Sequence, residues 1–258
     1  VTAVAFAGNE LRGQLLHALH CADQDPWVRV CIIRGAGKSF CAGYDLSAPV
    51  ETPLPVFEAG GDGQFQRSVV SLWCSFWDLQ KPIIAQVHGH CLAGGAELAA
   101  ACDLIYVGES SRIGFPPVRS MGLPDTQIFP WVMGMRAAME LMLTGDSMTG
   151  QQAAESRWAN RCYPDAELEA AVLEKAATIA KIPTDLLQFN KRSVHRAMEV
   201  MGMRTALRYG TDLQALSFHS DSSLKFMQKF SNKGDDYKKG DAAQAFRERD
   251  QKFRNSKL

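Results

Sequence analysis

Short apolar, β-rich runs alternate with segments of helical periodicity, and this alternation most constrains how the chain can fold. The runs cover residues 28–33, 82–87 and 103–107, and each lies close to a glycine. Runs of this length without polar alternation are typical of largely buried strands. Segments 10–22 and 64–79 instead repeat bulky apolar residues on one helical face. The sequence therefore predicts an α/β fold.

Beyond about residue 130 the pattern favours helices alone, and we expect no further strands there. Five segments have helical character, and the breaks carry turn residues such as Gly145, Pro164 and Pro183. The segments are 131–143, 149–158, 165–180, 186–201 and 204–219. Residues 47–63, rich in proline and glycine, indicate a surface loop, and 242–252 indicate a short terminal helix.

Composition excludes several classes of protein. Lys+Arg and Asp+Glu are equal at 28 each among 258 residues, which argues against a general nucleic-acid binder. No apolar run approaches the roughly 20 residues that span a bilayer, and the first residues lack a signal-peptide pattern. Seven scattered cysteines without a Cys-x-x-Cys pair indicate no metal site and a reducing, cytoplasmic location. Five of them have the apolar neighbours expected of small core residues: Cys21, Cys31, Cys74, Cys91 and Cys102.

Two glycine turns follow two of the predicted strands. The first reads Gly-Ala-Gly-Lys-Ser-Phe-Cys-Ala-Gly-Tyr-Asp-Leu at 35–46; its small Ala42 and Gly43 allow close approach to the backbone, and Asp45 is placed to cap a helical turn. The second, at 87–98, opens an alanine-rich helix predicted at 94–102, whose free N–H groups favour a developing negative oxygen. The simpler interpretation of each is an ordinary strand-to-helix turn.

Together these blocks resemble the crotonase, or enoyl-CoA hydratase/isomerase, superfamily. The resemblance includes Pro-Ile-Ile-Ala-Gln-Val-His-Gly at 82–89 and Ala-Gly-Gly-Ala-Glu-Leu-Ala-Ala-Ala-Cys-Asp-Leu at 93–104. It continues with Met-Glu-Leu-Met-Leu-Thr-Gly at 139–145 and Asn-Lys at 190–191, and so covers nearly the whole chain. Only the extreme N-terminus departs, because no opening strand is visible before Asn9.

The resemblance implies a crotonase-like spiral of ββα units at 1–180 and a helical C-terminal trimerisation region at 181–258. It also implies a homotrimer or a hexamer of paired trimers, and an acyl-CoA substrate with no separate cofactor. Backbone N–H groups of Tyr44 and Gly94 would form the oxyanion hole. Residues implied around the coenzyme A and acyl group are Lys38, Ala42, Gly43, Asp45, Leu46, Gly95, Pro117, Phe246 and Arg249.

Glu97 matches one of the two catalytic glutamates of enoyl-CoA hydratases, and its position in the first helical turn also suits a simple complement to the helix dipole. The second glutamate is absent, since Pro117 stands in its place and cannot transfer a proton. Asp125 is the candidate substitute. Its alternative role is an N-cap for a helix beginning near Ile128.

The remaining candidates each have a simpler alternative. His88 and His90 are weighed as catalytic groups against polar contacts at a strand end. The Tyr44 phenol is placed to pack against an acyl group or to donate a hydrogen bond. Trp73 and Trp77 are expected in the core, with acyl contact as the alternative. Lys38 suits a phosphate, while Phe246 and Arg249 suit a neighbouring subunit's coenzyme A or an exposed amphipathic helix.

Three functional hypotheses follow. The leading one is a lyase or isomerase of the enoyl-CoA hydratase type, with Glu97 carrying a proton at a thioester enolate. The second is a hydrolase of the same fold, acting on a carbon–carbon bond of a β-diketone or on a ring-ketone thioester, in which His88, His90 or Asp125 positions water. The third is a non-catalytic acyl-CoA-binding homologue.

Overall fold

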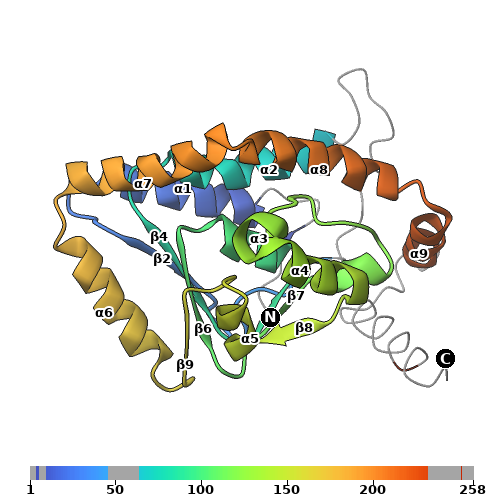
Figure 1. The fold of residues 1–258 in the computed structure, drawn as a ribbon, viewed down its shortest axis with the longest axis horizontal. Coiled ribbons are helices and arrows are strands. Elements are labelled where there is room, and N and C mark those ends of the chain that lie inside the picture. The colour runs from blue at the N-terminus through green and yellow to red at the C-terminus, as the bar shows by residue number, and fades with distance from the viewer. Residues whose placement is uncertain (1–3, 6–9, 46–63, 232–250, 252–258) are drawn as a thin grey trace.

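The computed structural model describes residues 4–5, 10–45, 64–231 and 251 (Figure 1). Helices and strands alternate through the first two thirds of the chain and helices dominate the last third. In chain order the elements are β1 (Val4–Ala5), α1 (Glu10–Gln24), β2 (Cys31–Arg34), β3 (Tyr44–Asp45), α2 (Gln64–Asp78), β4 (Ile83–Val87), β5 (His90–Leu92), α3 (Gly94–Ala101), β6 (Leu104–Gly108), β7 (Arg112–Gly114), the 3-10 helix η1 (Pro116–Arg119), α4 (Phe129–Thr144), β8 (Ser147–Thr149), α5 (Gly150–Glu155), β9 (Arg161–Tyr163), α6 (Leu168–Ala180), α7 (Thr184–Val200), α8 (Met203–Ser217) and α9 (Asp221–Ser231).

The strands form three small sheets, and the chain winds between them. The main sheet has the order β2-β4-β6-β9 with every pair parallel. In the second sheet β5 runs parallel to β7, and β7 pairs antiparallel with β8. Twice in succession a main-sheet strand is followed by a second-sheet strand and then by helix: β4-β5-α3 and β6-β7-η1-α4. This repeating ββα winding confirms the predicted α/β spiral.

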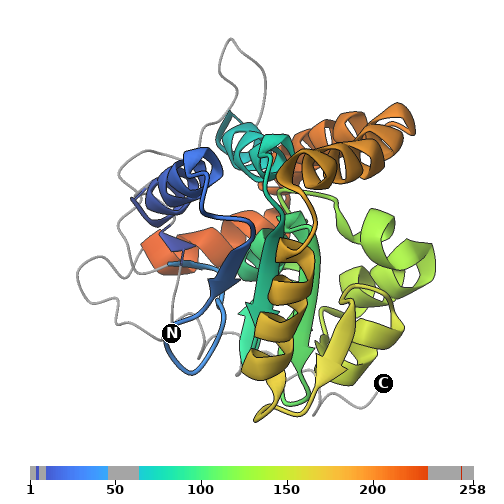
Figure 2. The same ribbon diagram turned by 90° about the vertical axis from the view of Figure 1, so that its left-hand side faces the viewer.

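The central strand β4 explains why its sequence carries no polar alternation. Ile83, Ala85 and Val87 pack into the main core with apolar side chains of α2 and α3. Ile84 points to the opposite face, where it packs with Leu168 of α6. Figure 2 shows α6 lying across that outer face of the sheet. Both faces of the strand are therefore covered, as expected for a short continuous apolar run in a parallel sheet.

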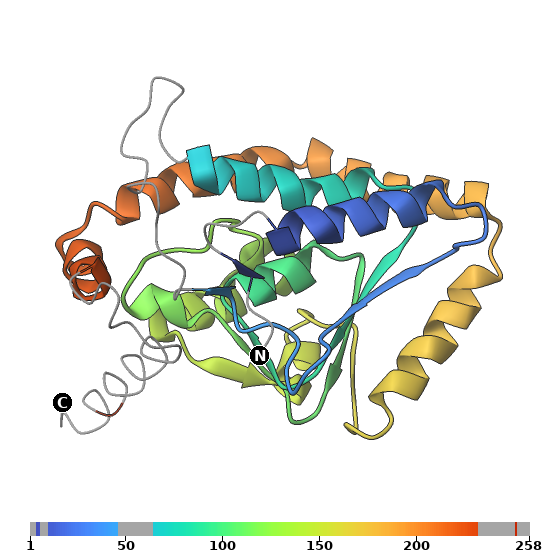
Figure 3. The same cartoon turned by 180° about the vertical axis from the view of Figure 1, so that it is seen from behind.

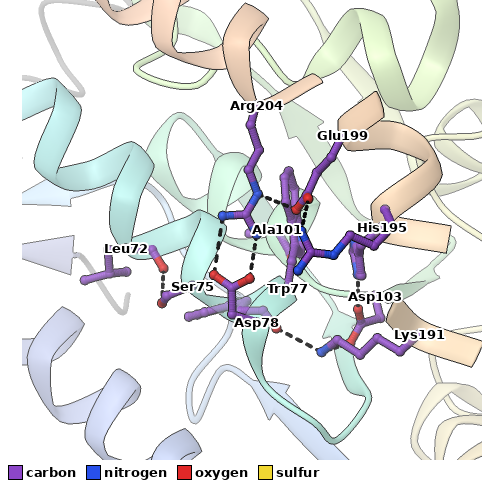
Figure 4. Close-up of polar contacts among 12 residues, drawn as sticks. Leu72, Ser75, Trp77, Asp78, Ala101, Asp103, Lys191, His195, Glu199 and Arg204 are labelled. Carbon is purple, nitrogen blue, oxygen red and sulfur yellow. Dashed lines mark hydrogen bonds and ion pairs between the residues drawn. The ribbon is translucent and has the colours of Figure 1, made fainter. Parts of the chain in front are cut away.

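Helices α7 and α8 follow one another along one side of the molecule, on the same side as α1 and α2 (Figures 1 and 3). A buried lysine fixes α7 to the core (Figure 4). Lys191 Nζ donates to the carbonyls of Phe76 at 2.9 Å and Lys81 at 3.0 Å, and it pairs with Asp103 Oδ2 at 2.8 Å. The second Asp103 oxygen lies 2.8 Å from His195 Nε2.

A second group of contacts surrounds the buried indole of Trp77. The His195 ring stacks on it with a centroid separation of 5.3 Å, and the Arg204 guanidinium lies 5.7 Å from its centroid. Arg204 also joins α8 to α2 and α7 through ion pairs with Asp78 and Glu199 (Figure 4). The C-terminal helices are thus attached to the core by polar contacts as well as apolar packing.

The structure confirms the three predicted strands and the predicted helices at 10–22, 64–79 and 94–102, with shifts of a few residues at their ends. Trp73 and Trp77 are buried in the core, as expected. The expectation that strands stop near residue 130 is wrong, because β8 and β9 complete two of the sheets. The expectation of no strand before Asn9 is also wrong, since β1 pairs with β3.

The structure also bears on the predictions for the cysteines and for membrane-spanning segments. Cys74, Cys91 and Cys102 are buried and Cys31 is half-buried, but Cys21 is exposed on α1, so its assignment to the core is wrong. Among the described residues, no helix has the length and apolar character needed to cross a membrane.

Candidate active site

The two glycine turns meet at Gly43. Cys41 in the first turn bridges to Cys91 in β5, and the Cys41 carbonyl accepts a hydrogen bond from Leu92 N–H at 2.9 Å. Gly43 has φ of +105°, a conformation that side chains other than glycine rarely adopt. A β-carbon there would lie 2.8 Å from Ala93 Cβ and 3.5 Å from Gly94 N. The first turn therefore needs glycine to approach the start of α3.

The start of α3 has an unusual backbone. Ala93 precedes the helix with φ of 51° and ψ of −127°, and no side chain caps this end by a hydrogen bond. Strained conformations of this kind persist where the surrounding structure holds them, often at functional sites. Gly95 packs so tightly that a β-carbon would lie 2.4 Å from the Cys41 carbonyl oxygen. The first N–H groups of α3, with the positive end of its dipole, thus face the region of the first turn.

Glu97 lies in the first turn of α3 and is almost completely buried, at 1% exposure. Its Oε1 accepts two hydrogen bonds from Thr126, from N–H at 2.6 Å and from the hydroxyl at 2.8 Å. Its Oε2 is also buried and has no hydrogen-bond partner among the described residues. Burial, and then the nearby Asp125 carboxylate, raise the pKa of Glu97 well above its ordinary value, although Thr126 opposes the shift.

Asp125 is the second buried carboxyl group of the site. Its Oδ2 accepts a hydrogen bond from the Tyr44 hydroxyl at 2.9 Å. Burial raises the pKa of Asp125 to about 6, against the lowering effects of that hydrogen bond and of the Arg12 charge. Helix α4 begins only at Phe129 after Ile128, and no side chain caps it, so the alternative role of Asp125 as an N-cap is wrong.

Tyr44 connects the two glycine turns to this carboxyl pair. A β-carbon on Gly94 would lie 3.1 Å from two carbons of the Tyr44 ring, so the ring lies against the Gly94 backbone. Burial, followed by the charges of Asp125 and Glu97, raises the pKa of the Tyr44 phenol well above its ordinary value. The structure thus brings together four of the predicted residues: Tyr44, Gly94, Glu97 and Asp125.

Other predicted residues lie apart or outside the described structure. His88 Nε2 lies 2.9 Å from the Gly37 carbonyl, and His90 Nδ1 lies 3.3 Å from Ser39 Oγ, so both rings contact the first turn. Lys38 is exposed, Ala42 and Pro117 are half-buried, and Pro117 belongs to η1. Asp45 lies in β3, and its side chain and the residues that follow it, including Leu46, lie outside the described residues, as do Phe246 and Arg249.

Two residues of the site were not predicted. Thr126 holds one oxygen of Glu97 through both its backbone and its side chain. Its only sequence signal is its position directly after Asp125. Arg12 is buried in α1, at 3% exposure, and its positive charge acts on both Tyr44 and Asp125. The sequence signal for Arg12 was a basic residue within an otherwise apolar helix face.

The fold and the site together define a class of protein: a ββα spiral with a glycine-lined helix start beside a buried carboxyl pair. A sequence profile of the enoyl-CoA hydratase/isomerase family matches residues 5–240 of the chain. The chain therefore belongs to the enoyl-CoA hydratase/isomerase family, as the sequence blocks indicated.

Individual relatives agree with this assignment. The chain is 31% identical over 228 residues to the 2,3-dehydroadipyl-CoA hydratase of Escherichia coli strain K12, covering 86% of each protein. Its structure is similar to a crystal structure of an enoyl-CoA hydratase from Mycobacterium smegmatis, with a TM-score of 0.80, 27% identity and coverage of 88% of this chain and 82% of that one. An enoyl-CoA hydratase/isomerase from Xanthobacter autotrophicus Py2 matches with a TM-score of 0.77, 31% identity and coverage of 90% and 86%.

Proposed function

We propose that the chain moves protons on an acyl-CoA thioester through an enolate, and that shifting a carbon–carbon double bond is the reaction its residues fit best. The observation that carries this proposal is the buried pair of Glu97 and Asp125, with Glu97 Oε2 lacking a partner among the described residues. Buried carboxyl groups with raised pKa values exchange protons near neutral pH, as general acid–base catalysis requires.

The proposed isomerisation consumes no water and no second substrate. The thioester oxygen is held by the N–H groups of Tyr44 and Gly94. One carboxylate removes a proton from the α carbon of a 3-enoyl-CoA, and the electron pair moves onto the thioester oxygen. The other carboxyl group protonates the γ carbon, and the double bond then lies between the α and β carbons. Donors at the oxygen stabilise the enolate more than the neutral substrate.

The relatives named as hydratases make hydration the nearest competing reaction. A hydratase of this family uses two glutamates on one water, and here Pro117 replaces the second. Hydration would require Asp125 to act in its place. Proton transfer between two carbons needs only the carboxyl pair already present, which is why we favour isomerisation.

A hydrolase of the same fold is the second alternative, with Asp125 activating water at a β-diketone or ring-ketone thioester. His88 and His90 are weak candidates for that role because each is in contact with the Gly37–Ser39 turn. Asp125, with a pKa raised to about 6, is an effective base at neutral pH and is the group that such a hydrolase would depend on.

We also propose the setting in which the enzyme works. Coenzyme A enters only as part of the substrate, and Lys38, which is exposed, is expected to bind one of its phosphates. Exposed apolar side chains on α7 and α8, including Phe189, Tyr209 and Leu216, support assembly into trimers or hexamers. The division at residue 180, the contributions of Phe246 and Arg249, and a cytoplasmic location stay predictions.

The test is a paired assay with crotonyl-CoA and a 3-enoyl-CoA. Wild-type protein is expected to isomerise the 3-enoyl thioester, and Glu97→Gln and Asp125→Asn are each expected to lower kcat by about 100-fold or more. Hydration of crotonyl-CoA at the higher rate would favour the hydratase. Activity lost in Asp125→Asn but kept in Glu97→Gln would favour the hydrolase. Tight acyl-CoA binding without turnover would indicate a non-catalytic homologue.

A further inference from the structure

The Tyr44 side chain contacts both the start of α3 and the carboxyl pair. Its ring lies against Gly94, and its hydroxyl donates to Asp125 Oδ2 at 2.9 Å. The same residue is proposed to supply a backbone N–H to the thioester oxygen. A displacement of the phenol would therefore affect both the carboxyl pair and the oxyanion hole.

The Tyr44 phenol is the donor in its hydrogen bond with Asp125 Oδ2. Burial and the two neighbouring carboxyl groups raise the pKa of Tyr44, so that its hydroxyl keeps its proton at neutral pH. A hydrogen bond donated to a carboxylate favours the ionised form over the neutral acid. The contact at 2.9 Å thus favours Asp125 as the charged member of the pair.

The surroundings of Glu97 favour its neutral form, in contrast to the Tyr44 contact of Asp125. Both Thr126 donors act on Oε1, and Oε2 is buried without a partner among the described residues. A neutral carboxyl group has one acceptor oxygen and one hydroxyl, and these two positions match that requirement if the proton is on Oε2. The Asp125 backbone N–H also acts on the Glu97 carboxyl group and lowers its pKa, but Oε2 itself has no hydrogen bond from the described residues. An ionised Glu97 would leave this buried oxygen unpaired, which is costly.

The charged groups around Glu97 and Asp125 favour one negative charge on the carboxyl pair. In the described part of the chain, the titratable groups acting on Asp125 are Tyr44 from β3, Glu97 from α3 and Arg12 from α1. Arg12 is the one cation among them, and it is buried. Two adjacent buried carboxylates repel each other, so a pair of this kind retains one proton over a range of pH.

We propose that Tyr44 is a positioning residue that keeps Asp125 ionised and leaves the proton of the carboxyl pair on Glu97 Oε2. Asp125 then is the base and Glu97 the acid, an assignment that rests on the proposed function for its catalytic meaning. After proton removal by Asp125 and donation by Glu97, the pair still holds one proton, now on Asp125. That proton must return to Glu97 before the next turnover.

The direct test follows the carboxyl groups of the substrate-free protein by infrared spectroscopy as the pH is varied. Difference spectra against Asp125→Asn and Glu97→Gln assign the two C=O bands. Asp125 is expected to ionise at lower pH than Glu97, and Tyr44→Phe is expected to raise the Asp125 midpoint by about one pH unit. Tyr106→Phe, which removes a buried phenol outside the site, serves as the matched control and is expected to leave both bands unchanged.

Ionisation of Glu97 before Asp125, or an unchanged Asp125 midpoint in Tyr44→Phe, would overturn the proposal. If Tyr44→Phe does not fold, the order of ionisation in the wild-type protein decides alone. Turnover provides a separate readout: in Tyr44→Phe the acid limb of the kcat profile is expected to move to higher pH by a similar amount. Infrared shifts without any turnover of a 3-enoyl-CoA would keep this proposal and reject the proposed reaction.

Discussion

At the scale of single residues, Gly43 controls how closely the two glycine turns approach each other. A methyl group there would lie 2.8 Å from Ala93 Cβ, and alanine would also have to adopt φ of +105°. Gly43→Ala is therefore expected to lose about 1–2 kcal/mol of unfolding free energy from backbone strain, with a further loss from the clash. Because the clash displaces the start of α3, kcat is expected to fall about 100-fold. Urea unfolding and steady-state kinetics measure the two effects.

Gly202→Ala introduces backbone strain without a clash, and so separates the effect of strain from that of displacing the start of α3. Gly202 has a similar φ of +96°, but nothing lies within 4 Å of a β-carbon there. This variant is expected to lose stability while keeping its kcat. Equal kcat values in Gly43→Ala and wild type would show that the contact with Ala93 does not position the proposed oxyanion hole.

The sequence predicted the chemical types in the site better than their contacts. Glu97, Asp125, Tyr44 and Gly94 were all candidates, because each lies at a recognisable position in a glycine turn or after a proline. The hydrogen bond between Tyr44 and Asp125 joins residues 81 positions apart, and no local pattern encodes it. The double hydrogen bond from Thr126 likewise depends on how the segment before α4 returns to α3.

At the scale of elements, Lys191 attaches α7 to the core (Figure 4). Its ammonium group satisfies two backbone carbonyls and one oxygen of Asp103, and its side chain is 4% exposed. Lys191→Met keeps the apolar stem and removes the charge. Breaking one side of a buried pair costs about 3–5 kcal/mol, so a loss of that size in unfolding free energy is expected. Denaturant titration monitored by circular dichroism measures it.

Arg196→Met, on the same helix, is the matched control. Arg196 pairs with Glu199, but its side chain is 71% exposed, and such surface pairs contribute less than about 1 kcal/mol. A loss in Lys191→Met no larger than in Arg196→Met would contradict the assignment of Lys191 as the attachment point of α7.

The predicted elements were those long enough to show a helical period or a continuous apolar run. Strands β2, β4 and β6 have four or five residues each and lie in apolar runs. Strands β5, β7, β8 and β9 have three residues each, too few for a periodic pattern. Each of them also contains an exposed polar residue, such as His90, Arg112 or Arg161, so only their partners in the folded sheets define them.

At the scale of the whole molecule, the buried carboxyl pair makes stability depend on pH. The pKa of Asp125 rises from an ordinary value of 3.8 to about 6 on folding, so the folded protein holds a proton that the unfolded chain releases. The stabilisation is complete below pH 3.8 and is lost as the pH rises through 6. Over that range Asp125→Asn is expected to gain stability relative to wild type, by up to about 3 kcal/mol at neutral pH. Denaturant unfolding at a series of pH values from 4 to 8 provides the comparison.

The exposed Asp212→Asn controls for the loss of one negative charge, and its difference from wild type is expected to stay nearly constant across the series. A wild-type protein that gains stability relative to Asp125→Asn as the pH rises would show that Asp125 is stabilised in its charged form by folding. That result would remove the basis for treating the two carboxyl groups as a proton-sharing pair.

The central claim is that the enzyme forms an enolate of a bound acyl-CoA at Glu97 and Asp125. Exchange of the α-carbon protons of an acyl-CoA in D2O, followed by NMR, measures enolate formation directly, whichever product the enzyme finally releases. Rapid exchange is expected with wild-type protein, and exchange reduced by about 100-fold or more is expected in Asp125→Asn, which lacks the proposed base. Bound acyl-CoA that exchanges no α proton, or exchange undiminished when both carboxyl groups are replaced, would contradict the central claim.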